Sequence, residues 1–268
     1  MTDWQTYEPI IRTSVFFGVL LLMALLEIFQ PRRPLHASKP QRWLNNLGLV
    51  VLNSLILRLL FPAAAVGIAL LAEQHHWGLL HTPLLEQLPS PLLLVATILL
   101  LDYLIWAQHR VFHAVPLLWR LHRMHHADLD IDVTTALRFH PLEILLSMLI
   151  KTAVITLLGL PALAVLLFEI LLNASAMFNH ANIRLPNRLD RHLRRIIVTP
   201  DMHRVHHSWH PAETHSNFGF FLSVWDQLFG TYVPQPKDGH LNMTIGLKQY
   251  RQPQDSRIDQ LLIQPFRE

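Results

Sequence analysis

The sequence predicts an all-α integral membrane protein in which four or five membrane helices carry a helical cap, and three observations lead to this fold class. Hydrophobic residues make up 51% of the 268 residues and charged residues only 15%, with a mean hydropathy of +0.28. This composition is too apolar for an ordinary soluble enzyme. Five apolar runs approach or exceed the roughly 20 residues that cross a bilayer. The 18 histidines include three tight clusters at or beyond the ends of those runs.

The apolar runs define the expected membrane helices one by one. They cover residues 13–29, 47–72, 91–106, 142–160 and 161–178. No small-residue cleavage site follows the first run, so we expect it to persist as a helix. The last two runs are of marginal length, and only Gly159, Leu160 and Pro161 join them. We therefore expect a tight helical hairpin there, one that need not cross the bilayer completely.

Basic residues in the loops predict the orientation, because Lys and Arg accumulate on the cytoplasmic side of a membrane. Such residues follow the first, third and fifth runs, whereas the segment from Glu73 to Ser90 contains none. We therefore expect the N-terminus outside and every histidine cluster on the cytoplasmic face. The compact chain with no visible haem or flavin domain favours the bacterial inner membrane, with the endoplasmic reticulum as the alternative.

Three histidine clusters predict a metal site built almost wholly from imidazole. They are His109 with His113, His122 with His125 and His126, and His203 with His206 and His207. Residues three and four apart share one face of a helix, whereas adjacent residues diverge by about 100°. Each His-x-x-His-His box can therefore serve two neighbouring metals. We expect the cap to hold a dimetal site at helix ends near the lipid headgroups.

The remaining composition narrows the chemistry. The chain has no cysteine, which excludes disulfides, thiolate zinc sites and iron–sulfur clusters. It also has no His-Glu pair of the kind found in HExxH zinc hydrolases. A net charge of +3 is too small to indicate nucleic acid, although basic loops would attract an acidic redox carrier or anionic lipids. Nitrogen ligands suit iron, and a pair of irons can activate dioxygen to attack an unactivated C–H bond.

Further motifs follow the clusters in a set order and carry a family resemblance. They are Arg138-Phe139-His140-Pro141, Phe178-Asn179-His180, Asn217-Phe218-Gly219 and Trp225-Asp226-Gln227-Leu228-Phe229-Gly230-Thr231. With the three histidine clusters, this series resembles the fatty acid hydroxylase/sterol desaturase superfamily over about residues 90–233. Each motif alone is weak, but the ordered series is specific.

The resemblance implies a membrane-bound non-haem di-iron oxygenase. Such an enzyme uses O2 and two electrons from an external donor of the cytochrome b5-like, ferredoxin or flavodoxin type to hydroxylate a fatty acyl chain, a sterol or a related apolar lipid. The implied metal ligands are His109, His113, His122, His125, His126, His180, His203, His206 and His207. His215 is a further candidate ligand. Zinc can displace iron during expression.

Two more residues are candidates for the catalytic site. His140 lies in the Phe-His-Pro motif. Asp102 lies seven residues before His109, two turns earlier on the same side of the expected helix. It could accept a hydrogen bond from an imidazole N–H. The alternative for Asp102 is a helix-end acid that pairs with another helix.

The chain divides into three expected parts: N-terminal membrane helices over residues 1–90, a catalytic domain over 91–233 and a polar C-terminal tail over 234–268. We favour hydroxylation because the His-x-x-x-His spacing with a lone Asn-His is typical of the hydroxylases. A lipid desaturase is the alternative of the same chemistry. A non-enzymatic membrane protein that binds or transports metal is the alternative of another class. We expect the lipid to enter between the membrane helices and the cap.

Overall fold

The computed structural model describes residues 3–267, and the regular structure of these residues is helical. Extended pairing among them is limited to isolated β-bridges. The all-α prediction is therefore confirmed. The five long helices are α1 (Asp3–Phe29), α2 (Lys39–Leu60), α4 (Ser90–Ala114), α6 (Pro141–Leu158) and α7 (Ala162–His180).

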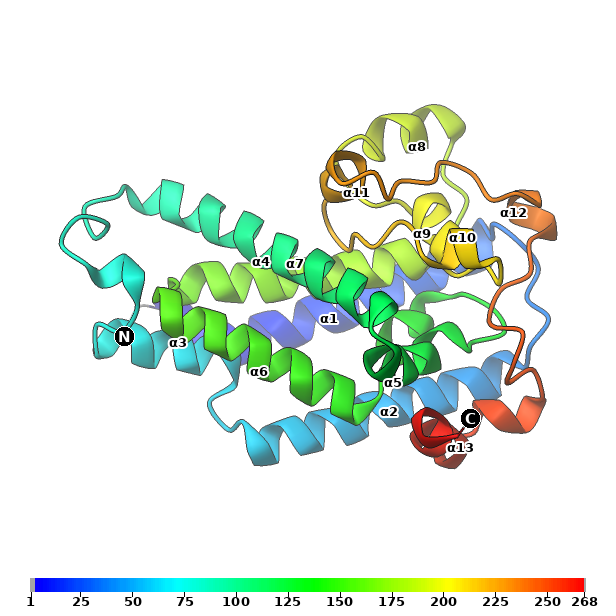
Figure 1. Ribbon diagram of the computed structural model, residues 1–268, viewed down its shortest axis with the longest axis horizontal. Coiled ribbons are helices and arrows are strands. Elements are labelled where there is room, and N and C mark those ends of the chain that lie inside the picture. The colour runs from blue at the N-terminus through cyan, green and yellow to red at the C-terminus, as the bar shows by residue number, and fades with distance from the viewer. Residues whose placement is uncertain (1–2, 268) are drawn as a thin grey trace.

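The five long helices lie along the long axis of the molecule (Figure 1). Five helical segments of the described chain are long and apolar enough to cross a membrane, which confirms the upper count of four or five. Only 11% of the apolar window of α1 is buried in the protein, against 50% of that of α7. A long helix with apolar side chains facing outward needs lipid around it. The chain is an integral membrane protein, and α7 is the most enclosed of its spans.

The second apolar run is divided, although the sequence predicts one continuous run over residues 47–72. α2 ends at Leu60, and α3 (Ala64–Gln74) begins after a break at Phe61 and Pro62. Pro62 has no N–H to continue the helical hydrogen bonds, and it disfavours helical backbone in the residue before it. Phe61 accordingly leaves the helix with φ −129° and ψ 67°.

α6 and α7 form the tight hairpin that the sequence predicts. α6 ends at Leu158, and the next residue, Gly159, has a φ of 70° in the left-handed region that favours glycine. Pro161 then precedes α7. The two helices have 18 and 19 residues, or about 27 and 28 Å at 1.5 Å per residue. That length is close to the roughly 30 Å thickness of the hydrocarbon core.

Shorter helices gather at one end of the bundle and form the cap, while α1 begins at the other end (Figure 1). The cap helices are α5 (Pro116–His126), η2 (Val133–Leu137), α8 (Asn187–Leu193), α9 (Pro200–His206), α10 (Pro211–Thr214), α11 (Val224–Leu228), α12 (Gly239–Asn242), η3 (Pro253–Ser256), α13 (Ile258–Ile263) and η4 (Gln264–Phe266). A further short helix, η1 (Leu79–His81), follows α3. The start of α1 and the histidine clusters thus lie at opposite ends of the bundle, and the cytoplasmic location of the histidine end stays a prediction.

A buried ionic network fastens the cap to α2. The guanidinium of Arg42 donates to both carboxylate oxygens of Asp128, at 2.6 and 2.8 Å, and to Asp132 at 2.6 Å. Burial alone would raise the pKa of Asp128, but Arg42 and Arg138 overcome this effect and lower that pKa to about 2. Because Asp128 follows α5 directly, the network fixes the end of α5 relative to the membrane helices.

The C-terminal segment packs on α5 as part of the cap. Arg123 donates to the carbonyls of Gln264 and Arg267, at 2.7 and 2.6 Å, and Arg120 donates to that of Pro265 at 2.8 Å. The C-terminal segment therefore stabilises the position of the helix that carries the second histidine cluster.

The division of the chain into three parts at residues 90 and 233 stays a prediction.

Candidate metal centre

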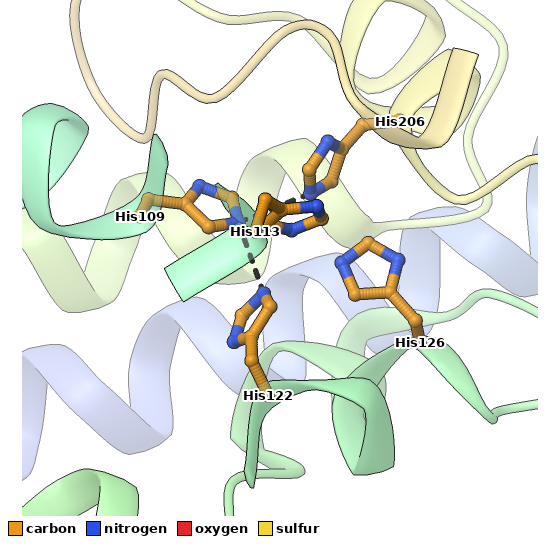
Figure 2. A group of neighbouring side chains, drawn as sticks. All are labelled: His109, His113, His122, His126 and His206. Carbon is orange, nitrogen blue, oxygen red and sulfur yellow. Dashed lines mark hydrogen bonds between the residues drawn. The ribbon is translucent and has the colours of Figure 1, made fainter. Parts of the chain in front are cut away.

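Two groups of buried histidines converge where the bundle meets the cap. Within each group the ligand nitrogens lie within 4.8 Å of one another. Figure 2 shows the larger group, with rings from α4, α5 and α9 directed toward a common space. The structure brings together all nine histidines that the resemblance implies. We call the groups the five-histidine site, His109, His113, His122, His126 and His206, and the four-histidine site, His125, His180, His203 and His207.

Each His-x-x-His-His box contributes to both sites, as its spacing predicts. In α5 the first and third histidines face the five-histidine site, and the second faces the four-histidine site. The box that begins in α9 has the reverse arrangement, because only its second histidine, His206, belongs to the five-histidine site. Adjacent residues diverge around a helix while residues four apart share a face. The two boxes therefore link the two sites into one unit.

Two membrane helices complete the sites. His109 and His113 lie one turn apart near the end of α4, and His180 is the last residue of α7. Val115 leaves the helix with an extended backbone, φ −95° and ψ 117°, and Pro116 then begins α5. A residue before proline disfavours helical backbone, so α4 and α5 meet at a corner that brings their histidines together.

The spacing of the ring nitrogens fits bound metal ions. In the five-histidine site, Nε2 of His109 lies 3.0 Å from Nε2 of His122 and 3.1 Å from Nε2 of His206. In the four-histidine site, Nε2 of His180 lies 3.1 Å from the Nε2 atoms of one histidine of α5 and one of α9. Two nitrogens bound to one metal at about 2.1 Å, with an angle of about 90 to 110°, are about 3.0 to 3.4 Å apart. The observed separations match this range.

Several ring nitrogens in the sites have no hydrogen-bond partner within residues 3–267. They include Nε2 of His113 and both ring nitrogens of His126 and of His207. A buried polar atom without a partner costs about 1 to 3 kcal/mol, and native proteins seldom leave several together. Metal ions would satisfy such nitrogens.

Hydrogen bonds on the outer side determine which nitrogen faces inward. Nδ1–H of His109 donates to the carbonyl of Phe218 at 2.7 Å, and Nδ1–H of His206 donates to that of Ser216 at 2.6 Å. His180 donates in the same way, at 2.7 Å, to the carbonyl four residues earlier in α7. A carbonyl only accepts, so the proton lies on Nδ1 and the Nε2 lone pair points into the site.

Glu143 is a site residue that the sequence analysis missed. It lies in the first turn of α6, is buried, and its Oε1 accepts a hydrogen bond from Nδ1 of His122 at 2.6 Å. A carboxylate in this position orients the ring and makes the opposite nitrogen a stronger donor to a metal. The signal that could have identified it is an acidic residue inside an apolar run, three residues after His140.

The Asn-Phe-Gly and Trp-Asp motifs support His109 from outside the site. The Asp226 carboxylate accepts from the backbone N–H of Phe218 at 2.9 Å and of Gly219 at 2.8 Å, and from Nε1 of Trp106 at 3.0 Å. A Cβ at Gly219 would lie 3.0 Å from this carboxylate, so glycine permits the close approach. Asp226 thereby holds the carbonyl that accepts from His109.

Asp102 lies apart from the imidazoles, contrary to the expectation from its spacing. Its Oδ2 accepts from Nε1 of Trp225 at 2.8 Å and from the backbone N–H of Leu222 at 3.2 Å. The seven-residue spacing gives the correct side of α4 but places Asp102 about 10 Å from His109 along the helix. At this position on α4, Asp102 contacts the start of α11 and the loop before it, and its hydrogen bonds connect them to α4.

His140 also lies apart from both sites. It caps α6, since its Nδ1 accepts from the N–H of Leu142 at 3.2 Å, and its Nε2–H donates to the carbonyl of Leu262 at 3.1 Å. These contacts join α6 to the C-terminal helices. The position of His140 therefore gives no support to the catalytic role predicted from its motif.

His215 lies at the rim of the five-histidine site. Its Nδ1 is 3.1 Å from Nδ1 of His113, but the residue is exposed and belongs to neither group. Its role as a ligand stays a prediction.

Burial keeps the cap histidines neutral. Burial, followed by the neighbouring imidazoles, holds the pKa of these side chains well below the ordinary value. A neutral imidazole has a free lone pair, so a metal ion can bind near pH 7 without displacing a proton. The groups concerned are His125, His126, His203, His206 and His207.

The fold and the site together define an integral membrane protein whose cap encloses two adjacent all-histidine metal sites. The chain belongs to the fatty acid hydroxylase family, because the model of that family matches residues 94–231, about half of the chain. This match confirms the resemblance seen in the motifs. The protein is accordingly an enzyme of the oxidoreductase class.

Similar proteins have names that fit this family. Ornithine lipid hydroxylase OlsE of Rhizobium tropici is 25% identical over 241 residues, which cover 86% of this chain and 70% of that protein. Alkylglycerol monooxygenase of Xenopus tropicalis is 29% identical over 226 residues, 84% of this chain and 47% of that protein. The human alkylglycerol monooxygenase is 29% identical over 129 residues, 46% of this chain and 27% of that protein. The chain thus spans about half or less of these monooxygenases. No match was found among solved structures.

Proposed function

We propose that this protein is a membrane-bound non-haem di-iron monooxygenase that hydroxylates a lipid. The observation that carries the proposal is the convergence of nine buried histidines into two adjacent sites. Nitrogen donors without thiolates suit iron, and each site would hold one ion through its Nε2 atoms. The names of two similar proteins, a lipid hydroxylase and a monooxygenase, support the reaction class.

Bound iron would supply the activation of O2. In the overall reaction one C–H bond of the lipid becomes a C–O–H group, the second oxygen atom leaves as water, and two electrons and two protons enter from outside. The residues of the chain hold the site in place for this reaction. Glu143 orients His122, the backbone carbonyls of Phe218 and Ser216 orient two further rings, and burial excludes bulk water.

A cavity leads from the five-histidine site into the membrane bundle. It has a volume of about 580 Å³, and both His109 and His122 line it. Apolar side chains such as Phe16, Met148 and Leu172 line its middle. A predominantly apolar cavity of this size suits a lipid chain. We place the lipid in this cavity, with its reacting carbon at the five-histidine site.

The lipid has a route into the cavity from the side of the bundle. Phe17 on α1 and Ser54 on α2 line the cavity and are also exposed on the surface of the protein. Both helices belong to the membrane-spanning segments. We therefore place the entrance between α1 and α2, within the bilayer, rather than between the helices and the cap.

The electrons would come from an external acidic carrier of the cytochrome b5-like, ferredoxin or flavodoxin type. The segment around α8 carries exposed arginines, and a positive surface attracts an acidic carrier. We place this surface on the cytoplasmic side, because loops rich in Arg and Lys lie at the cap end, and we favour the bacterial inner membrane. The exposed arginines are Arg184, Arg188, Arg191 and Arg195.

Labelled oxygen tests the reaction directly. Purified protein in nanodiscs of extracted membrane lipids receives a chemical reductant and isotopically labelled O2, and the lipids are analysed by mass spectrometry. We expect lipids that carry one labelled oxygen atom, and none with a His206→Ala variant. Products with a new double bond and no label would instead make the enzyme a desaturase. A metal-loaded protein that forms neither product would contradict the proposal.

A further inference from the structure

The cavity that ends at the metal sites has a cluster of charged side chains at its other end, inside the membrane-spanning segments. Glu169 on α7 is 5% exposed and Lys151 on α6 is 9% exposed. Nζ of Lys151 contacts Oε1 of Glu169, and Nη1 of Arg12 on α1 lies 2.8 Å from Oε2 of Glu169. All three side chains line the cavity. The reaction at the histidine sites makes no use of them.

Charges at this depth are costly, which calls for a function. Removal of an ion from water costs several kcal/mol, and apolar side chains of similar volume often hold helices together equally well. The helices that carry Arg12, Lys151 and Glu169 already share an apolar core. Ionisable residues in membrane spans commonly face a cavity and mark the path of a ligand. The cluster is therefore better explained by a ligand than by helix association.

The cluster has more hydrogen-bond donors than its own acceptors use. Arg12 and Lys151 contribute two positive charges, and Glu169 and Glu8 contribute two negative charges, so the paired carboxylates balance the two cations. Glu8 contacts Arg12 at 3.0 Å, through the same Nη1 that faces Glu169. An arginine offers five N–H donors and a lysine three, and the described contacts of both cations go only to these two carboxylates. The remaining donors suit a negatively charged oxygen group.

The cavity has charged groups at one end, histidines at the other and a predominantly apolar lining between them. Between the charged cluster and the histidines, Ile144, Ser147 and Met148 of α6 and Leu172 and Asn173 of α7 line the cavity. Lys151 lies eight residues beyond Glu143 on α6, and the cluster on α7 lies eleven residues before the last residue of that helix. At 1.5 Å per residue, the two ends are about 12 to 16 Å apart. This profile matches an amphiphile with a charged group at one end.

We propose that Arg12 and Lys151 bind a negatively charged oxygen group of the lipid, a carboxylate or a phosphate, and so determine which carbon reaches the metal sites. Glu169 positions both cations. An extended chain advances about 1.2 Å per bond, so the oxidised carbon lies about ten to thirteen bonds from the charged group. The inference rests on the proposed lipid hydroxylation for the metal end of the cavity.

Photolabelling tests the charged end without requiring turnover. Purified protein in phosphatidylcholine nanodiscs is exposed to three diazirine probes of equal chain length: a fatty acid, its methyl ester and a lysophosphatidate. Hydrogen bonds to charged groups contribute about 1.5 to 3 kcal/mol, so we expect at least one anionic probe to label cavity residues about tenfold more than the ester. Preference for the acid or for the phosphate identifies the charged group, and equal labelling by both supports the shared chemistry.

Variants link this preference to the cluster. The triple variant Arg12→Met/Lys151→Met/Glu169→Leu removes both cations together with the buried carboxylate that pairs with them, so Glu169 is not left as an unpaired charge. We expect it to label with the ester as before and to lose the anionic preference. Arg58→Met is the matched control, because Arg58 is an exposed arginine of α2 in the same bilayer. Wild-type protein that labels no more with either anionic probe than with the ester, or a triple variant that keeps the anionic preference, would overturn the proposal.

The two proposals fail separately. Anionic preference without labelled-oxygen products would leave the charged site standing and remove the hydroxylase function. Hydroxylated products without anionic preference would support the hydroxylase function and remove the charged site.

Discussion

The two histidine sites differ in what surrounds them. The five-histidine site borders the cavity through His109 and His122, and the exposed His215 lies at its rim. The side chains of the four-histidine site are 0 to 1% exposed, and Phe139 stacks on His125 with ring centroids 4.6 Å apart. We infer that an ion in the five-histidine site meets the substrate, while an ion in the four-histidine site is its enclosed neighbour.

The outer hydrogen bonds of the two sites differ as well. Glu143, a carboxylate, accepts from an imidazole of the five-histidine site, whereas the corresponding bond described for the four-histidine site goes from His180 to a backbone carbonyl. A carboxylate partner makes an imidazole a stronger ligand than a carbonyl does. The site nearer the substrate therefore has the stronger donor.

Removal of one ligand from each site gives the largest expected effect. We expect His206→Ala and His207→Ala each to lower activity by more than about 100-fold, beyond the range for residues that only support a ligand. Each variant should keep about one metal ion per chain, measured by elemental mass spectrometry. A chelator should remove the ion left in His207→Ala faster, because that ion lies beside the cavity. If the chelator removed the remaining ion from both variants at the same rate, the proposed difference in exposure between the two sites would be wrong.

Glu143→Gln tests the carboxylate that distinguishes the five-histidine site. Loss of such a partner typically lowers metal affinity or activity by about 10 to 100-fold. We expect metal to leave the five-histidine site first during titration with a chelator. Asp259→Asn, at an exposed carboxylate of α13 that belongs to neither histidine site, is the control. Wild-type metal affinity and activity in Glu143→Gln would make the hydrogen bond to His122 irrelevant to function.

Ser147→Phe tests whether the cavity serves the five-histidine site. The larger side chain narrows the cavity away from the ligands, so we expect kcat/KM for the lipid to fall by about tenfold, the effect of about 1.4 kcal/mol of lost binding. Metal content should stay at the wild-type value. Leu149→Phe, on an exposed part of α6, should leave both quantities unchanged. If both variants behave alike, the cavity is not the route of the substrate.

Acid should weaken the ionic network that fixes α5, which supplies both sites. The pKa of Asp128 is about 2 in the folded protein, below its ordinary value of 3.8. A lowered pKa contributes stability above the ordinary value, and this contribution is lost as the pH falls from about 4 toward 2. The shift corresponds to about 2 kcal/mol at 1.36 kcal/mol per pKa unit. We expect the melting temperature of the wild type to fall across this interval more than that of Asp128→Asn. If the melting temperatures of the two proteins fell equally over this pH range, the stabilising role of the Asp128 carboxylate would be contradicted.

The parts of the protein that the sequence predicts are those governed by local periodicity. Spacing on a helix determines which histidines share a face, and the boxes divide between the sites accordingly. The pair Glu143 and His122 is 21 residues apart, and the pair Arg42 and Asp128 is 86 apart. Only the packing of α2, α5 and α6 brings these residues together, so no local pattern reveals them. For Asp102, periodicity gives the side of the helix but not what lies opposite.

The central claim is that the nine histidines hold two metal ions, and metal stoichiometry tests it most directly. Elemental mass spectrometry on freshly purified protein should give about two irons per chain, and close to none in the double variant His125→Ala/His206→Ala, which removes one histidine from each site. Two zincs with the same dependence would confirm the sites and leave the redox metal to be restored. One metal or none in the wild type would contradict the account.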